Sequence, residues 1–133
     1  MTRYARWLFG ISAATNLAVS VALLAFGSFV ARRLAFDPIV GTNVVLFNFA
    51  GMLIGLFGYA YVRVAMDPVR FRPFIHLTAI GKLLAFASAA LPWLTGIIPS
   101  RLPILMSADV IFAILFFDYL RRTQQSSTHH GRA

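Results

Sequence analysis

Two charged residues lie inside long apolar stretches of this 133-residue chain. Lys82, the single lysine, lies within the apolar stretch 74–97, and Asp109 lies within the stretch 102–120. A charge in the interior of a membrane-spanning segment is costly, so such a residue is by default a candidate functional site. Lys82 offers an ammonium donor, and Asp109 offers a carboxylate that can accept a hydrogen bond, pair with a cation or move a proton.

Two asparagines are predicted to lie at the same depths as these charges. At a helical rise of 1.5 Å per residue, Asn16 and Lys82 both lie about 12–14 Å from one face of the membrane. Asn48 and Asp109 both lie about 8–10 Å from the other face. The sequence therefore predicts two polar layers, one of Lys82 with Asn16 and one of Asp109 with Asn48, and these four residues are the candidate polar cluster or ligand site.

The spacing leaves the partner of each charge open. Lys82 and Asp109 differ in depth by about 5 Å, which a lysine side chain can bridge, so a direct salt bridge is one interpretation. In the other, Lys82 snorkels toward the headgroups. Asp109 is too short to snorkel far, and it is either a paired carboxylate or a neutral acid bonded to Asn48 or Ser107. A structural polar clamp and a proton or ligand site both remain open.

The composition indicates a protein that lies in a bilayer. Hydrophobic residues make up 59% of the chain and charged residues 12%, whereas soluble domains have about a quarter of their residues charged. Stretches near 20 apolar residues are long enough to cross the hydrocarbon core, and four occur, at 7–30, 43–62, 74–97 and 102–120. None alternates as a barrel strand would, so helices are expected. We predict an all-α membrane protein, a four-transmembrane-helix bundle forming one domain over 1–122, followed by a disordered polar tail over 123–133.

Basic residues predict the orientation. With four spans running up-down-up-down, the N-terminus, the middle loop and the C-terminus share one side. That side carries eight arginines and the other carries three: Arg3, Arg6, Arg63, Arg70, Arg72, Arg121, Arg122 and Arg132 against Arg32, Arg33 and Arg101. The positive-inside rule then places both termini in the cytoplasm, and we expect a bacterial inner (plasma) membrane. An alternative for the first apolar stretch is a cleavable signal peptide, although the stretch exceeds the usual h-region length.

The middle loop and the small residues suggest contacts with lipid and between helices. Arg70 and Arg72 are candidates for binding lipid headgroups, the alternative being an ordinary positive-inside loop. Small residues recur at helical spacing in the first two spans, where they predict close packing of one span on the other, or alternatively a homodimer face. They are Gly10, Ala14, Ala18 and Ala22 in the first span and Gly51, Gly55 and Gly58, with Asn48, in the second.

Several classes of chemistry are not predicted. The chain has no cysteine, and no intramembrane pair of ligands has the spacing of a metal site. Phosphate-binding loops, dinucleotide fingerprints and nucleophile elbows are lacking, so we expect no catalytic residue, metal or cofactor. Nucleic acid is not an expected partner, because the arginines flank the apolar stretches. The favoured function is a non-enzymatic structural or accessory subunit, or a homo-oligomer, in the lipid bilayer. The alternatives are a binder or carrier of a small lipophilic molecule and a lipid-modifying enzyme that uses Asp109.

Overall fold

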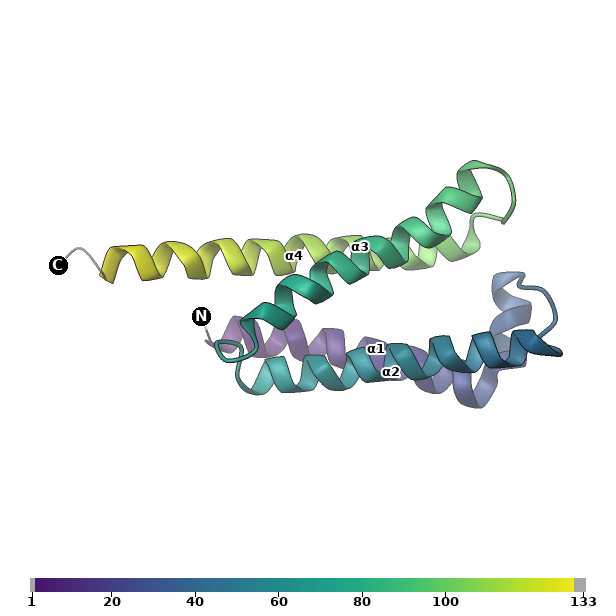
Figure 1. Cartoon of the computed structure of the whole chain (residues 1–133), viewed down its shortest axis with the longest axis horizontal. Coiled ribbons are helices and arrows are strands. Elements are labelled where there is room, and N and C mark those ends of the chain that lie inside the picture. Colours follow the sequence, from purple (N-terminus) through teal and green to yellow (C-terminus); the bar gives the residue numbers. More distant parts are fainter. Residues whose placement is uncertain (1, 131–133) are drawn as a thin grey trace. The chain divides into compact units, whose positions relative to one another are not determined.

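The structure, a computed structural model, describes residues 2–130 and is all-helical over that range (Figure 1). Its helices are α1 (Thr2–Leu34), α2 (Thr42–Met66), α3 (Arg72–Leu94) and α4 (Arg101–His130). Each of the four contains a stretch long and apolar enough to cross a membrane. The predicted number of helices long and apolar enough to span a membrane is therefore confirmed for these residues.

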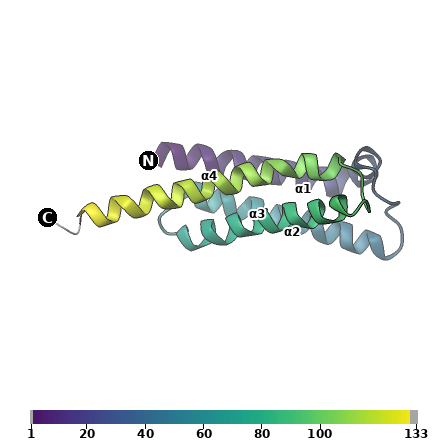
Figure 2. The same ribbon diagram turned by 90° about the horizontal axis from the view of Figure 1, so that it is seen from above.

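The chain divides into two compact units, one built on α1 and α2 and one on α3 and α4. Figure 2 shows each unit from a second side, with its two helices joined by a short loop. In the first unit, Gly51 and Gly58 of α2 approach Leu24 and Leu17 of α1, so residue numbers fall on one helix as they rise on the other. In the second, Arg72 contacts Leu120 and Lys82 contacts Asp109. Both units are thus antiparallel helical hairpins.

The glycines of α2 allow α1 to approach closely. A Cβ atom added to Gly51 would lie 2.8 Å from Leu24 Cδ2, and one added to Gly58 would lie 2.8 Å from Leu17 Cγ. At Gly55 the added atom would lie 2.6 Å from the Ser20 hydroxyl oxygen. Real Cβ atoms do not make such short contacts, so larger residues at these positions require the α1 side chains to shift, and at Gly58 the Leu17 backbone nitrogen also lies within 3.2 Å of the added atom. Small residues that permit close helix packing are a feature of membrane helices.

Gly10, in the first part of α1, does not lie on this contact. A Cβ added to Gly10 would meet nothing within 4 Å, and Ala14 and Ala18 are exposed. The predicted packing on the second span is therefore wrong for Gly10, and it stays a prediction for Ala14, Ala18 and Ala22. Instead, α1 places Leu17 and Ser20 against α2, because large side chains on one helix fill the space left by glycines on the other.

Helix α1 bends near its C-terminal end, as Figure 1 shows. Phe26 has φ −127° and ψ 29°, outside the helical region, and the pair Gly27–Ser28 follows it. Gly/Ser pairs are a recognised cause of helix kinks. The missing side chain of Gly27 also leaves room for the Phe47 ring, whose Cε1 atom lies 3.0 Å from where a Cβ would stand. The absence of a side chain at Gly27 therefore accommodates an aromatic side chain of α2.

Helix α3 ends at Leu94, although the apolar stretch that predicts the third span continues to residue 97. Gly96 has φ 75°. Its N–H donates to the Trp93 carbonyl at 3.0 Å, and the Ile97 N–H donates to the Pro92 carbonyl at 2.8 Å. This is the Schellman arrangement, in which a left-handed glycine ends the helix and satisfies its last carbonyls. Hydropathy alone does not predict this helix end.

Helix α4 extends beyond the predicted fourth span, through Leu120 to His130. The sequence predicts a disordered tail over 123–133, whereas α4 is helical as far as His130 and residues 131–133 lie outside the described residues, so disorder of the tail stays a prediction. The Thr123 hydroxyl donates to the Tyr119 and Leu120 carbonyls, each at 3.0 Å, and so continues the hydrogen bonding of the last apolar turn. Glutamines at 124 and 125 are good helix formers, which favours propagation.

Candidate functional site

Lys82 of α3 and Asp109 of α4 form an ion pair. The Lys82 Nζ atom donates to Asp109 Oδ1 at 2.6 Å. Lys82 is only 6% exposed, and the Asp109 side chain is 28% exposed. The sequence left open a direct salt bridge or a Lys82 that snorkels toward the headgroups. The structure has the direct salt bridge, in which the Lys82 ammonium contacts α4.

The register of the hairpin explains why these groups meet. Asp109 and Phe112 are three residues apart on α4 and so share one face. The Lys82 Nζ atom lies 5.1 Å from the centroid of the Phe112 ring, within cation–π range. On α3, Ala79 is fully buried three residues before Lys82, and on α4 Ala113 is fully buried beside Phe112. Small residues at such buried positions permit close packing of helices.

The pair is well suited to holding two helices together in a medium without water. Opposite charges attract more strongly at low dielectric. Removing one partner there leaves an uncompensated buried charge. Thr78, one turn before Lys82, donates its hydroxyl to the Ile75 carbonyl at 3.1 Å. Among the residues that the structure describes, no buried side-chain nitrogen or oxygen atom lacks a hydrogen-bond partner. The buried polar side chains of the hairpin therefore all have hydrogen-bond partners in the described residues.

The other members of the predicted polar cluster belong to the first hairpin. Asn16 is half-buried on α1, and Asn48 is exposed on α2. Their predicted pairing with Lys82 and Asp109 stays a prediction. Ser107 is not the donor to Asp109, because its hydroxyl donates to the Ile104 carbonyl of its own helix at 2.6 Å.

A polar contact within the first hairpin is one that sequence reasoning missed. The Ser20 hydroxyl of α1 donates to the Gly51 carbonyl of α2 at 2.7 Å, and Ser20 is only 6% exposed. Such interhelical bonds from serine are a known source of association in lipid. The available signal is the spacing of Leu17, Ser20 and Leu24, which places the hydroxyl on the face that contacts α2.

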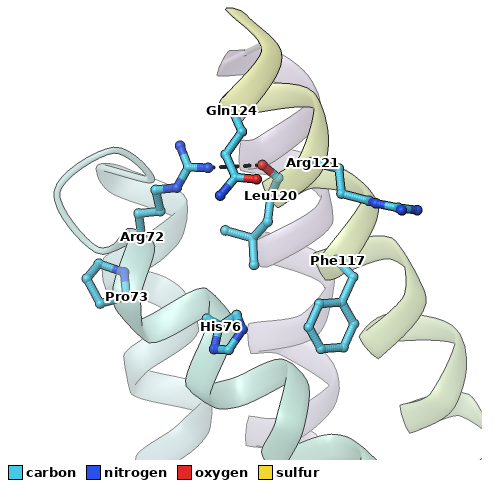
Figure 3. Close-up of a pocket in the computed structure, with 7 residues that line it drawn as sticks. All are labelled: Arg72, Pro73, His76, Phe117, Leu120, Arg121 and Gln124. Atoms are coloured by element: carbon cyan, nitrogen blue, oxygen red, sulfur yellow. Dashed lines mark hydrogen bonds between the residues drawn. The ribbon is translucent and has the colours of Figure 1, made fainter. Parts of the chain in front are cut away.

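A groove of about 620 Å³ lies between the start of α3 and α4, and Figure 3 shows its lining. It is lined by Arg72, Pro73, His76, Phe117, Leu120, Arg121 and Gln124. The Arg72 Nη2 atom donates to the Leu120 carbonyl oxygen at 3.0 Å. The His76 ring stands edge-on to the Phe117 ring, with centroids 5.9 Å apart. One end of the groove is therefore cationic and its wall is aromatic and apolar.

The structure separates the two arginines predicted to bind headgroups. Arg72 lines the groove, whereas the Arg70 guanidinium lies over the Phe71 ring, 5.8 Å from its centroid. The Arg70 N–H donates to the Asp67 carboxylate at 3.1 Å. Asp67 thus caps the turn before α3 and does not cap α3 itself, which begins at Arg72 with Pro73 in its first turn.

Sequence reasoning also missed most of the groove. Its four unpredicted polar or aromatic members are His76, Phe117, Arg121 and Gln124. Each helix contributes residues three or four apart, which is the spacing of one helical face. Hydropathy treats these residues as the ends of spans, so nothing in the linear pattern indicates that the two faces meet.

A second, open groove of about 520 Å³ lies along α1. It is lined by Arg6, Trp7, Gly10, Ile11 and Ala14, which are the turns that carry the exposed small residues. Neither groove is lined by Lys82 or Asp109. In the described part of the chain, no three histidine, cysteine or acidic residues come together as a metal site would require.

Comparisons with known proteins add no family to this description. The chain matches no protein-family profile, no curated protein and no solved structure.

Proposed function

We propose that the chain is a small integral membrane protein that acts as a non-enzymatic structural or accessory subunit, either as a homo-oligomer or within a larger membrane complex. The observation that carries this proposal is the ion pair of Lys82 with Asp109. In this pair, the two charged residues of the apolar stretches contact each other where α3 packs on α4. A lipid-modifying enzyme would need the Asp109 carboxylate to face a substrate, and its contact with Lys82 favours a structural role instead.

In the proposed membrane arrangement the four helices alternate in direction and both termini lie in the cytoplasm. The arginine count on the two sides, eight against three, supports this orientation. The second hairpin has the same asymmetry on its own. Four arginines lie at the end where α3 begins, and one lies at the end where α4 begins; they are Arg70, Arg72, Arg121 and Arg122 against Arg101.

Binding of a lipophilic molecule is a second candidate function. One observation favours it, the groove of about 620 Å³ with an apolar wall and a cationic end. Ligand pockets in proteins typically have about 300–1,000 Å³. This site differs from the polar cluster that the sequence singles out, because Lys82 and Asp109 do not line it.

Cysteine labelling tests the orientation. Since the chain has no cysteine, Val69→Cys in the α2–α3 loop and Ile97→Cys in the α3–α4 loop each report alone. Both side chains are well exposed, at 80% and 75%. We expect a membrane-impermeant maleimide to label Ile97→Cys in intact cells and Val69→Cys only in inverted vesicles. The unmodified chain is the unlabelled control, and the reverse pattern would contradict the proposed orientation.

The mass of the intact assembly tests the structural role. After mild extraction from native membranes, native mass spectrometry should show more than one 14.7 kDa chain per particle, or this chain with a foreign subunit. A particle containing one chain and no other protein would count against the proposal. A single chain that retains one small lipophilic molecule at fixed stoichiometry would favour the second candidate.

A further inference from the structure

We propose that the groove between α3 and α4 binds the phosphate of an anionic phospholipid in the cytoplasmic leaflet, with Arg72 as its main phosphate contact. The membrane location of the groove rests on the proposed function, because it requires the arginine-rich end of the second hairpin to lie at the cytoplasmic headgroups. That leaflet of the membrane holds anionic lipids, and basic residues at its surface are attracted to them.

Arg72 is held in place to meet a phosphate. Its side chain is half-buried, and its bond to the Leu120 carbonyl uses one of the five N–H groups of a guanidinium. The remaining N–H groups have the fork geometry that binds two phosphate oxygens at once. Figure 3 shows the guanidinium at the mouth of the groove, on the side where Gln124 approaches it.

The charges around the groove favour an anion. None of its seven lining residues is acidic. The nearest carboxylate along α4, Asp118, pairs with Arg122 at 2.7 Å, and Arg122 does not line the groove. Within the described residues, neither Arg72 nor Arg121 has a carboxylate partner. Arg121 points away from the other lining residues in Figure 3, so we assign it long-range attraction at the rim and not direct contact.

The rest of the groove matches the parts of a lipid below the phosphate. Pro73, Phe117 and Leu120 supply apolar surface, against which a glycerol backbone and the first acyl carbons can pack. The edge-on contact fixes the His76 ring beside Phe117. Imidazole nitrogens can donate to a phosphate oxygen, so His76 is the second polar group that we assign to the headgroup. Charge and shape together therefore indicate an amphiphile with a phosphate, and a free phosphate ion would leave the apolar wall unused.

Native mass spectrometry of the purified full chain tests the site with two defined lipids, phosphatidylglycerol and phosphatidylcholine of equal chain length. We expect the chain to retain phosphatidylglycerol preferentially. Arg72→Gln should weaken that retention by more than about fivefold, because the general attraction of one arginine to an anionic surface accounts for about fivefold and the bidentate contact adds to it. Retention of phosphatidylcholine should not change.

Arg70→Gln is the matched control. It removes the same charge from the same end of α3, but Arg70 does not line the groove. We expect it to remove only the general attraction of one arginine, a loss of at most about fivefold and clearly smaller than the loss in Arg72→Gln. Equal losses in Arg70→Gln and Arg72→Gln would indicate diffuse attraction and overturn the assigned site, as would equal retention of the two lipids by the unmodified chain.

A second variant guards against misfolding, because Arg72 also bonds to Leu120. Arg121→Gln alters an exposed side chain at the rim, so it should fold normally and lose at most the general attraction of one arginine, about fivefold in phosphatidylglycerol retention. Retention unchanged in both Arg72→Gln and Arg121→Gln would overturn the proposal. The same spectra give the number of chains per particle. If the particle contains several chains but shows no preference for phosphatidylglycerol, the lipid site is wrong and the structural role still stands. If the particle is a single chain that prefers phosphatidylglycerol, the lipid site stands and the structural role is wrong.

Discussion

Asp109→Asn is expected to lower the free energy of unfolding of the α3–α4 hairpin by about 3–5 kcal/mol, the usual effect of breaking a buried ion pair from one side. The amide leaves the Lys82 ammonium without its carboxylate, 6% exposed, between two apolar helices. The Phe112 ring, 5.1 Å from Nζ, compensates only a small part of a lost charge. The measurement is equilibrium unfolding in detergent micelles, followed by circular dichroism.

Asp118→Asn is the matched control for this prediction. Asp118 lies on the same helix and pairs with Arg122 at 2.7 Å, but both side chains are exposed, at 39% and 65%. Exposed pairs at this spacing contribute about 0.3–0.5 kcal/mol. The double variant Lys82→Met with Asp109→Leu removes both charges and should recover most of the loss, since apolar replacements of buried pairs are often neutral. Similar effects of Asp109→Asn and Asp118→Asn would contradict a structural role for the pair.

Gly58→Leu should have the second-largest effect, a loss of about 1–3 kcal/mol in the stability of the α1–α2 hairpin, typical of overpacking. A Cβ at Gly58 would lie 2.8 Å from Leu17 Cγ and 3.2 Å from the Leu17 backbone nitrogen. The Leu17 side chain can rotate away, but the backbone atom can move only if α1 moves. The same unfolding measurement checks this, with Gly58→Ala expected to lose less.

Gly10→Leu provides the comparison. It is the same substitution in the same hairpin, at a position where an added Cβ meets nothing within 4 Å. We expect it to leave the free energy of unfolding of the hairpin nearly unchanged. If Gly10→Leu destabilised the hairpin as much as Gly58→Leu, close packing at the α2 glycines would not be what holds α1 and α2 together.

The ends of α3 and α4 show what local hydropathy can and cannot predict. Hydropathy locates the four apolar helices, yet α3 stops at Leu94 within an apolar stretch and α4 continues through a polar one. In the first case Gly96 adopts φ 75° and ends the helix. In the second, backbone hydrogen bonding propagates from the apolar turns into residues with good helical propensity. Helix ends depend on capping geometry and propagation, which a count of apolar residues does not measure.

For the candidate site as well, the sequence predicts some features and only the tertiary structure gives the others. The depth of each residue along its helix axis predicts that Lys82 and Asp109 lie near the same level in the membrane. Depth does not decide whether Lys82 pairs with Asp109 or snorkels toward the headgroups. The rotation of each helix about its own axis decides between them, because it determines which face meets the neighbour. The groove around Arg72 and His76 depends on two such faces, and no linear spacing relates residue 76 to residue 117.

By itself, then, the sequence determined that this chain has four apolar helices and that Lys82 and Asp109 are its exceptional charges, because both properties follow from local composition. Only the tertiary structure decided that these charges bond to each other, that the glycines of α2 and not Gly10 of α1 form the close contact, and that Arg72 and His76 share a groove. Those outcomes depend on register and rotation between helices, which are set by side-chain packing across residues far apart in the chain.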